Sequence, residues 1–191
     1  MKTFKKMLTV AMLLTMMLSY ANEIKTATFK NSITIVQFSN VRKGHEFVIK
    51  DDRGTVLHRE TIDKNCTYSQ KFDLSKLKDG LYTVETIKDF VIIVSPFKIE
   101  SSKVTFLEQM ETKIFKPVVR RDNHQLFISQ LTFDTEPLKI ELFYNDNLIH
   151  TDTLKGEAIL KRVYALSKNE KGDYFVRMTS GDRQFIERFS I

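Results

Sequence analysis

The chain repeats itself at an offset of 92 residues, and this is the feature that most limits how it can fold. Residues 57–99 align on residues 149–191 without a gap, with ten identities in 43 positions. The repeat is as long as a small domain, so we expect two similar modules that each bury their own core. One motif, Gly-x-Tyr, recurs in the same register at Gly80, Tyr82, Gly172 and Tyr174.

Each module is predicted to be all-β. Apolar residues alternate with charged ones over Leu138–Leu142, which places one apolar face on a strand. Turn-forming residues at 51–54 and 145–147 separate pairs of strand-like segments. Strands that recur at such short intervals favour antiparallel β-sandwiches over units that alternate strand and helix. The modules are expected at residues 22–100 and 101–191, with the question of a shared strand left open.

Residues 1–21 have the layout of a secretory signal peptide. Basic residues precede the apolar run Met7–Leu18, and the small residues Ser19 and Ala21 precede a cleavage position. The run is shorter than the roughly 20 residues that a spanning helix needs, although an uncleaved anchor is the alternative. We therefore expect an N-terminal signal helix, an exported protein that is periplasmic or extracellular, and no transmembrane segment after cleavage.

The basic character of the chain belongs largely to this signal. The formal charge of +6 for the whole chain falls to +3 for residues 22–191, divided as +2 and +1 between the two modules. This charge is too small and too evenly divided to predict binding to nucleic acid. A small basic group, at Lys116, Arg120 and Arg121, is interpreted as a solvated linker or strand edge.

The segment from Leu74 to Tyr82, and its repeat from Leu166 to Tyr174, resembles the tyrosine corner of immunoglobulin-like sandwiches. The modules as a whole resemble secreted bacterial immunoglobulin-like domains of unknown function. They are distantly similar to the C-terminal sorting domains of type IX secretion cargo, but the Pro-Asn-Pro start of those domains is missing here. The resemblance implies two tandem immunoglobulin-like antiparallel β-sandwiches, in which Gly80, Tyr82, Gly172 and Tyr174 are structural.

Two pairs of residues are weak candidates for a surface site. His58 and Glu60 lie two apart on a predicted strand, and His150 and Asp152 repeat the pair, so each pair shares one face. Two ligands are fewer than a zinc site needs, and cross-strand partners are the simpler interpretation. We predict no catalytic residue, no metal and no cofactor, and therefore no enzyme, although only a structure could reveal a pair of glycosidase carboxylates.

The single cysteine, Cys66, cannot form an internal disulfide. In an exported protein it is either a buried thiol or part of an intermolecular bridge. Because Ala158 takes its place in the repeat, we interpret Cys66 as a small packing residue.

Two phenylalanines, Phe143 and Phe175, are predicted to point away from the core. Outward aromatic rings stack on sugars or meet a partner surface. The favoured interpretation is the interface between the two modules or the second face of a buried strand. The sequence thus predicts a secreted, non-catalytic interaction or structural protein of the cell envelope with a protein or glycan partner. The alternative is a carbohydrate-binding module, and a small exported hydrolase has less support.

Overall fold

The computed structural model describes residues 24–28, 34–64, 66–72, 74 and 77–191. Within this part the chain is all-β, the strands pair antiparallel, and a short 3-10 helix, η3 (Glu108–Met110), follows β8. The predicted fold class of antiparallel sandwiches is therefore confirmed, while the signal at 1–21 lies outside the described residues. In the same part of the chain, no helix is long and apolar enough to cross a membrane.

The chain divides into two compact units. Unit 1 comprises residues 1–85 and 95–110, and unit 2 comprises residues 86–94 and 111–191. The division passes through strand β7 (Val91–Glu100), whose first half pairs with β9 (Thr112–Phe115) and whose second half pairs with β8 (Lys103–Phe106).

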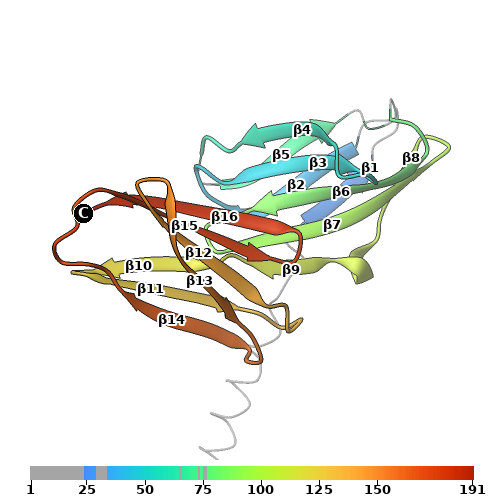
Figure 1. The fold of residues 1–191 in the computed structure, drawn as a ribbon. Coiled ribbons are helices and arrows are strands. Elements are labelled where there is room, and N and C mark those ends of the chain that lie inside the picture. Colours follow the sequence, from blue (N-terminus) through green and yellow to red (C-terminus); the bar gives the residue numbers. More distant parts are fainter. Residues whose placement is uncertain (1–23, 29–33, 65, 73, 75–76) are drawn as a thin grey trace, which may run out of the picture. The chain divides into compact units, whose positions relative to one another are not determined.

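Unit 1 has two sheets (Figure 1). One contains β1 (Ile24–Thr28), β2 (Thr34–Val41) and β5 (Cys66–Phe72), in that order. The other has the order β4 (Val56–Thr61), β3 (Glu46–Asp51), β6 (Gly80–Ile87), β7 and β8. Buried side chains from both sheets and their connections form one core: Val41, Phe47, Ile49, Ile62, Leu74, Tyr82, Val84, Phe97 and Ile99.

Unit 2 has the same strand order. One sheet contains β10 (Val118–Asp122), β11 (Gln125–Leu131) and β14 (Ile159–Ala165). The other has the order β13 (Asn147–Leu154), β12 (Leu138–Tyr144), β15 (Asp173–Ser180) and β16 (Arg183–Ser190). In both units the first, second and fifth strands form one sheet, and the fourth, third, sixth and seventh form the other. This is the order of a seven-stranded immunoglobulin-like sandwich in which the fourth strand pairs with the third instead of with the fifth.

Period-2 alternation builds the core of unit 2. On β12 the buried residues Leu138, Ile140 and Leu142 alternate with more exposed ones, and β15 does the same. The two sheets close on a core of twelve buried residues: Leu126, Ile128, Leu138, Ile140, Leu142, Leu154, Leu160, Leu166, Tyr174, Val176, Met178 and Phe189.

The hairpin turns have the chemistry that the sequence indicated. Asn145 and Asp146 have φ values of 45° and 64°, which suit the tight turn between β12 and β13. In unit 1, Asp51 accepts hydrogen bonds from the backbone N–H groups of Arg53 and Thr55, and Gly54 has a φ of 81°.

Candidate functional site

The Gly-x-Tyr motifs lie at equivalent places in the two units. The Tyr82 hydroxyl donates to the backbone carbonyl of Lys78 at 2.8 Å, and the Tyr174 hydroxyl donates to that of Glu170 at 3.4 Å. Both side chains are buried. Tyr82 stacks on Phe97, and Tyr174 stacks on Phe189, which is the equivalent of Phe97 in the repeat. Each hydroxyl thus reaches back four residues within its own unit.

The first histidine pair lies on β4, at the edge of its sheet. His58 Nε2 is 3.5 Å from Glu60 Oε2, with side-chain exposures of 43% and 32%. The imidazole ring also stacks on Phe47, with a centroid distance of 5.3 Å. This pair is a solvent-facing contact on one strand.

In the second pair, His150 and Asp152 do not contact each other. Asp152 on β13 instead accepts a hydrogen bond from the Tyr164 hydroxyl at 3.0 Å and pairs with Arg162 at 3.1 Å. The His150 ring meets the Tyr164 ring edge-on. Burial raises the pKa of the Tyr164 hydroxyl, and the hydrogen bond to Asp152 adds to this. Tyr164 therefore donates a hydrogen bond to Asp152, and this bond connects β14 to β13.

The described residues contain no group of three or more His, Cys, Asp or Glu placed to hold a metal ion. Cys66 begins β5, and its side chain lies outside the part of the chain that is described. The three basic residues near position 120 each contact a different acceptor group. Lys116 Nζ donates to the Lys88 carbonyl, Arg120 pairs with Asp122, and Arg121 donates to the Ser190 carbonyl.

The outer face of the β13-β12-β15-β16 sheet carries the two predicted outward phenylalanines. Phe143 and Phe175 are cross-strand partners whose rings stack 4.2 Å apart at an angle of 8°. The Arg177 guanidinium lies over Phe143, and that of Arg188 lies over Phe175, each 4.9 Å from the ring centroid. The two rings are therefore in contact with each other and with guanidinium groups, which leaves little open ring surface for a sugar.

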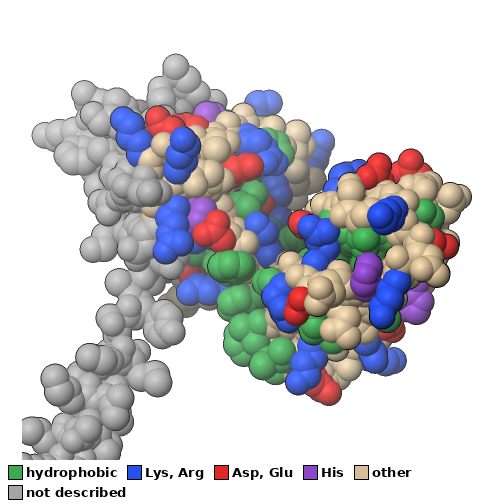
Figure 2. All heavy atoms as spheres, turned by 90° about the vertical axis from the view of Figure 1, so that its left-hand side faces the viewer, with side chains coloured by type: hydrophobic (Ala, Val, Ile, Leu, Met, Phe, Trp, Pro, Cys, Tyr) green, Lys and Arg blue, Asp and Glu red, His purple; other side chains and the backbone are tan. Residues whose placement is uncertain are grey.

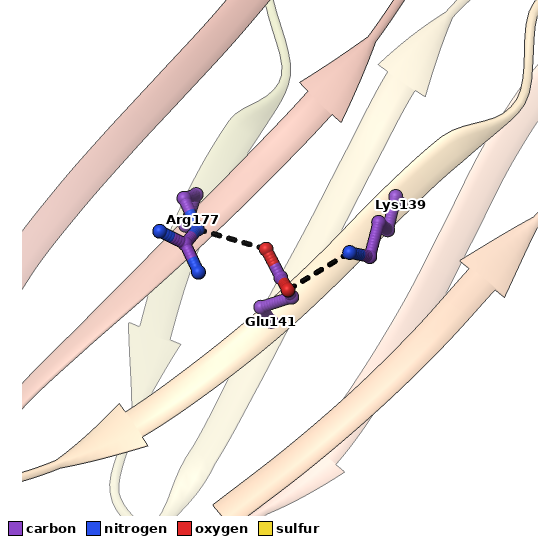
Figure 3. Close-up of polar contacts among 3 residues, drawn as sticks. All are labelled: Lys139, Glu141 and Arg177. Carbon is purple, nitrogen blue, oxygen red and sulfur yellow. Dashed lines mark hydrogen bonds and ion pairs between the residues drawn. The ribbon is translucent and has the colours of Figure 1, made fainter. Parts of the chain in front are cut away.

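An ion-pair network continues this row of contacts. Glu141 accepts hydrogen bonds from Lys139 Nζ at 2.9 Å and from Arg177 Nε at 2.8 Å (Figure 3). These two bonds, that from Lys139 first, hold the pKa of the Glu141 carboxyl below its usual value. Glu141 thus joins a lysine of its own strand, β12, to an arginine of the neighbouring strand, β15.

The outer face of the other sheet, β10-β11-β14, is different because it is largely apolar. Strand pairing aligns Val118, Ser129 and Lys161 in one row across the three strands. A second row contains Arg120, Phe127 and Val163, and Leu131 pairs with Ile159. Paired residues and those two apart point to the same side of a sheet. We call this surface the β14 face; it consists of Val118, Arg120, Phe127, Ser129, Leu131, Ile159, Lys161 and Val163.

Three of the five apolar side chains of the β14 face, those of Val118, Ile159 and Val163, are exposed to solvent, and the other two are partly buried. Ile159 is 56% exposed and Val163 is 52% exposed, although both lie within a strand. Near Ile159 the surface forms a shallow hollow of about 250 Å³ that also includes Phe90 and Phe115. On the side of the molecule drawn in Figure 2, hydrophobic side chains gather in one area, and basic and acidic ones are interspersed elsewhere. Large exposed apolar patches are characteristic of interaction sites on soluble proteins.

The β14 face has a signature in the sequence, although strict alternation does not reveal it. Leu126, Phe127 and Ile128 form a continuous apolar run on β11, with buried residues on either side of a half-buried one. On β14, buried Leu160 lies between exposed Ile159 and Lys161. Apolar residues on both sides of a strand indicate either a covered second face or an exposed apolar one.

Comparison with known proteins does not assign the chain to a family. No family model and no curated protein matches the chain. Among solved structures, "Biofilm associated protein - BSP domain" aligns over 89% of this chain at 11% identity and a TM-score of 0.28. The chain spans 29% of that structure's length. "Drosophila OTK, extracellular domains 3-5" aligns over 89% of this chain and 97% of its own, at 8% identity and a TM-score of 0.23. Neither likeness supports a conclusion about function.

Proposed function

We propose that the chain is an exported, non-catalytic interaction protein, and that its second unit binds a protein partner through the β14 face. The observation that carries this proposal is the exposure of Ile159 and Val163 on a regular strand whose outward neighbours are also mostly apolar. Leaving such surface in water is unfavourable by roughly 25 cal/mol per Å², and a partner that covers it recovers this free energy.

The placement of the titratable groups supports a binding role over a catalytic one. The carboxylates of Glu141 and Asp152 are each neutralised by adjacent cations, and neither contacts a second carboxylate. The phenol of Tyr164 is held in its protonated form by burial and by Asp152. These groups stabilise sheet surfaces and strand edges.

A sugar-binding role, the alternative from the sequence, has less support. Sugar rings stack on open aromatic faces. Phe143 and Phe175 instead stack on each other beneath Arg177 and Arg188.

The test is site-specific photocrosslinking in the cells that make the protein. A photoreactive phenylalanine analogue is placed at Val163 on the β14 face, and at exposed Thr151 on β13 as the matched control. We expect a discrete cross-linked protein band from position 163 and none from position 151. Equal bands from both positions, or none from position 163, would refute the proposed function.

A further inference from the structure

We propose that the segment bound by the β14 face is apolar and carries carboxylate groups, one of which lies opposite Lys161. This inference rests on the proposed function and specifies the chemistry of the partner. It is argued from the charges that accompany the apolar side chains.

Lys161 lies on β14, the edge strand of this sheet, with an apolar residue of the face on either side of it along the strand. These residues are Ile159 and Val163, and the cross-strand partner of Lys161 is Ser129. The side chain is exposed, and among the described residues no acidic group pairs with it. A cation set among apolar side chains selects a partner that places an acidic group there, because covering an unpaired charge is costly.

The second cation of the face is Arg120, on the opposite edge of the sheet. Its guanidinium lies 4.1 Å from the centroid of the Phe127 ring and 3.7 Å from Asp122. Two strand spacings separate β10 from β14, and Arg120 is level with Val163, two residues along from Lys161, so the backbone positions of Arg120 and Lys161 are about 12 Å apart. The weak, exposed pair with Asp122 leaves Arg120 able to meet a second carboxylate.

Acidic residues occur only at the margins of the face. Asp122 is the last residue of β10, and Glu157 precedes the start of β14. None of the eight residues of the β14 face is acidic, so a second copy of the same face would offer Lys161 no carboxylate from within the face. Charge complementarity favours an acidic, apolar partner segment over self-association.

The test uses the full chain as bait for a random peptide display library. We expect the peptides selected by the unmodified chain to be apolar and enriched in Asp and Glu relative to the starting library. Lys161→Glu should replace this acidic enrichment with enrichment in Lys and Arg. Lys168→Glu makes the same charge change at an exposed residue outside the face and should leave the selection unaltered. Thermal melting checks that the variants remain folded.

The outcomes separate the two levels of the proposal. If selected peptides depend on Val163, as judged with Val163→Asn, but show no acidic enrichment, or keep it with Lys161→Glu, this inference is wrong and the proposed function stands. If no peptide depends on Val163, the proposed function fails as well. Binding to vesicles of phosphatidylcholine and phosphatidylserine that is lost in both variants, without any selected peptide, would also overturn the proposal in favour of a lipid surface.

The affinity of one selected peptide for the unmodified chain and for a Lys161 variant gives a quantitative test. Lys161→Ala should weaken its binding by up to about fivefold at low salt, as is typical of one exposed ion pair. The difference should shrink as salt is added, because exposed charges are screened. An unchanged affinity at low salt would contradict the placement of a carboxylate opposite Lys161.

Discussion

Tyr164 on β14 donates its hydroxyl hydrogen to Asp152 on β13, with an oxygen–oxygen distance of 3.0 Å. These strands lie at the edges of different sheets of unit 2, so the bond joins the two layers of the sandwich at one side. Arg162 pairs with the same carboxylate at 3.1 Å. The contact stabilises a sandwich whose sheets share no backbone hydrogen bonds at this edge.

Replacing Tyr164 with Phe should lower the free energy of unfolding by about 1 kcal/mol, because a half-buried hydrogen bond to a carboxylate is lost. Urea unfolding at neutral pH measures this change.

The dependence of stability on alkaline pH gives an independent check on the role of Tyr164. The folded-state pKa of Tyr164 is raised above the ordinary value of 10.0, so the unfolded chain releases this proton first as the pH rises. The contribution of Tyr164 to stability is complete below pH 10 and is lost above it.

The comparison between unmodified and Tyr164→Phe protein isolates this effect from the titration of lysines. The stability difference between them should shrink as the pH rises above about 10. A difference that stays constant with pH would show that the raised pKa of Tyr164 is not coupled to folding.

The two equivalent glycines should respond differently to alanine. A methyl group on Gly172 would lie 2.8 Å from Asn145 Oδ1 and 2.8 Å from Tyr144 Cε2, whereas on Gly80 its nearest contact would be Tyr82 at 3.7 Å. Gly172→Ala should therefore lower stability by about 1–3 kcal/mol through overpacking. Gly80→Ala should be nearly neutral. Chemical denaturation of both variants tests the contrast, and equal losses would contradict it.

The two tyrosine hydroxyls should also differ. Tyr82→Phe removes a hydrogen bond of 2.8 Å, and Tyr174→Phe removes one of 3.4 Å. We expect a loss of about 1 kcal/mol for the first and a smaller loss for the second, since a longer bond is weaker. Melting curves for the pair measure this order. If neither replacement changes the melting temperature, the proposed tyrosine corner does not contribute to stability.

Glu141 gives a prediction on the acidic side. Its carboxyl has a pKa below the usual 4.5 because Lys139 and Arg177 donate hydrogen bonds to it. Lys139→Met should raise the pKa of Glu141 toward 4.5, as measured by NMR titration of the carboxyl carbon. The stabilising contribution is present above the unfolded-state value and is lost as the pH falls through the lowered one. Lys168→Met serves as the control, and an equal rise in that variant would indicate a general charge effect.

Strand β14 should show alternating sensitivity to mutation. Leu160 is 3% exposed, so Leu160→Ala should cost about 2–5 kcal/mol. Val163→Ser, on the exposed face, should change the free energy of unfolding by less than about 0.5 kcal/mol. Denaturant unfolding provides both values. A large loss from Val163→Ser would mean that this side chain is packed in the free protein and is not open to a partner.

Much of the fold could be predicted from the sequence. The 92-residue repeat corresponds to the same strand order in both units, and the alternation over Leu138–Leu142 identifies the buried side of β12. The outward direction of Phe143 and Phe175 followed from the same alternation. The site was harder to predict, because the exposure of Ile159 and Val163 depends on which second face remains uncovered.

The sequence by itself determined the strand periodicity, the turn positions and the pairing of Gly with Tyr in each half, because these depend on neighbours along the chain. Only the tertiary structure decided which charges meet. In the structure Asp152 bonds to Tyr164 and not to His150, whose ring meets the Tyr164 ring instead. Lys161 has no acidic partner among the described residues. The reason is that cross-strand and cross-sheet contacts bring together residues whose spacing in the sequence carries no information about their distance.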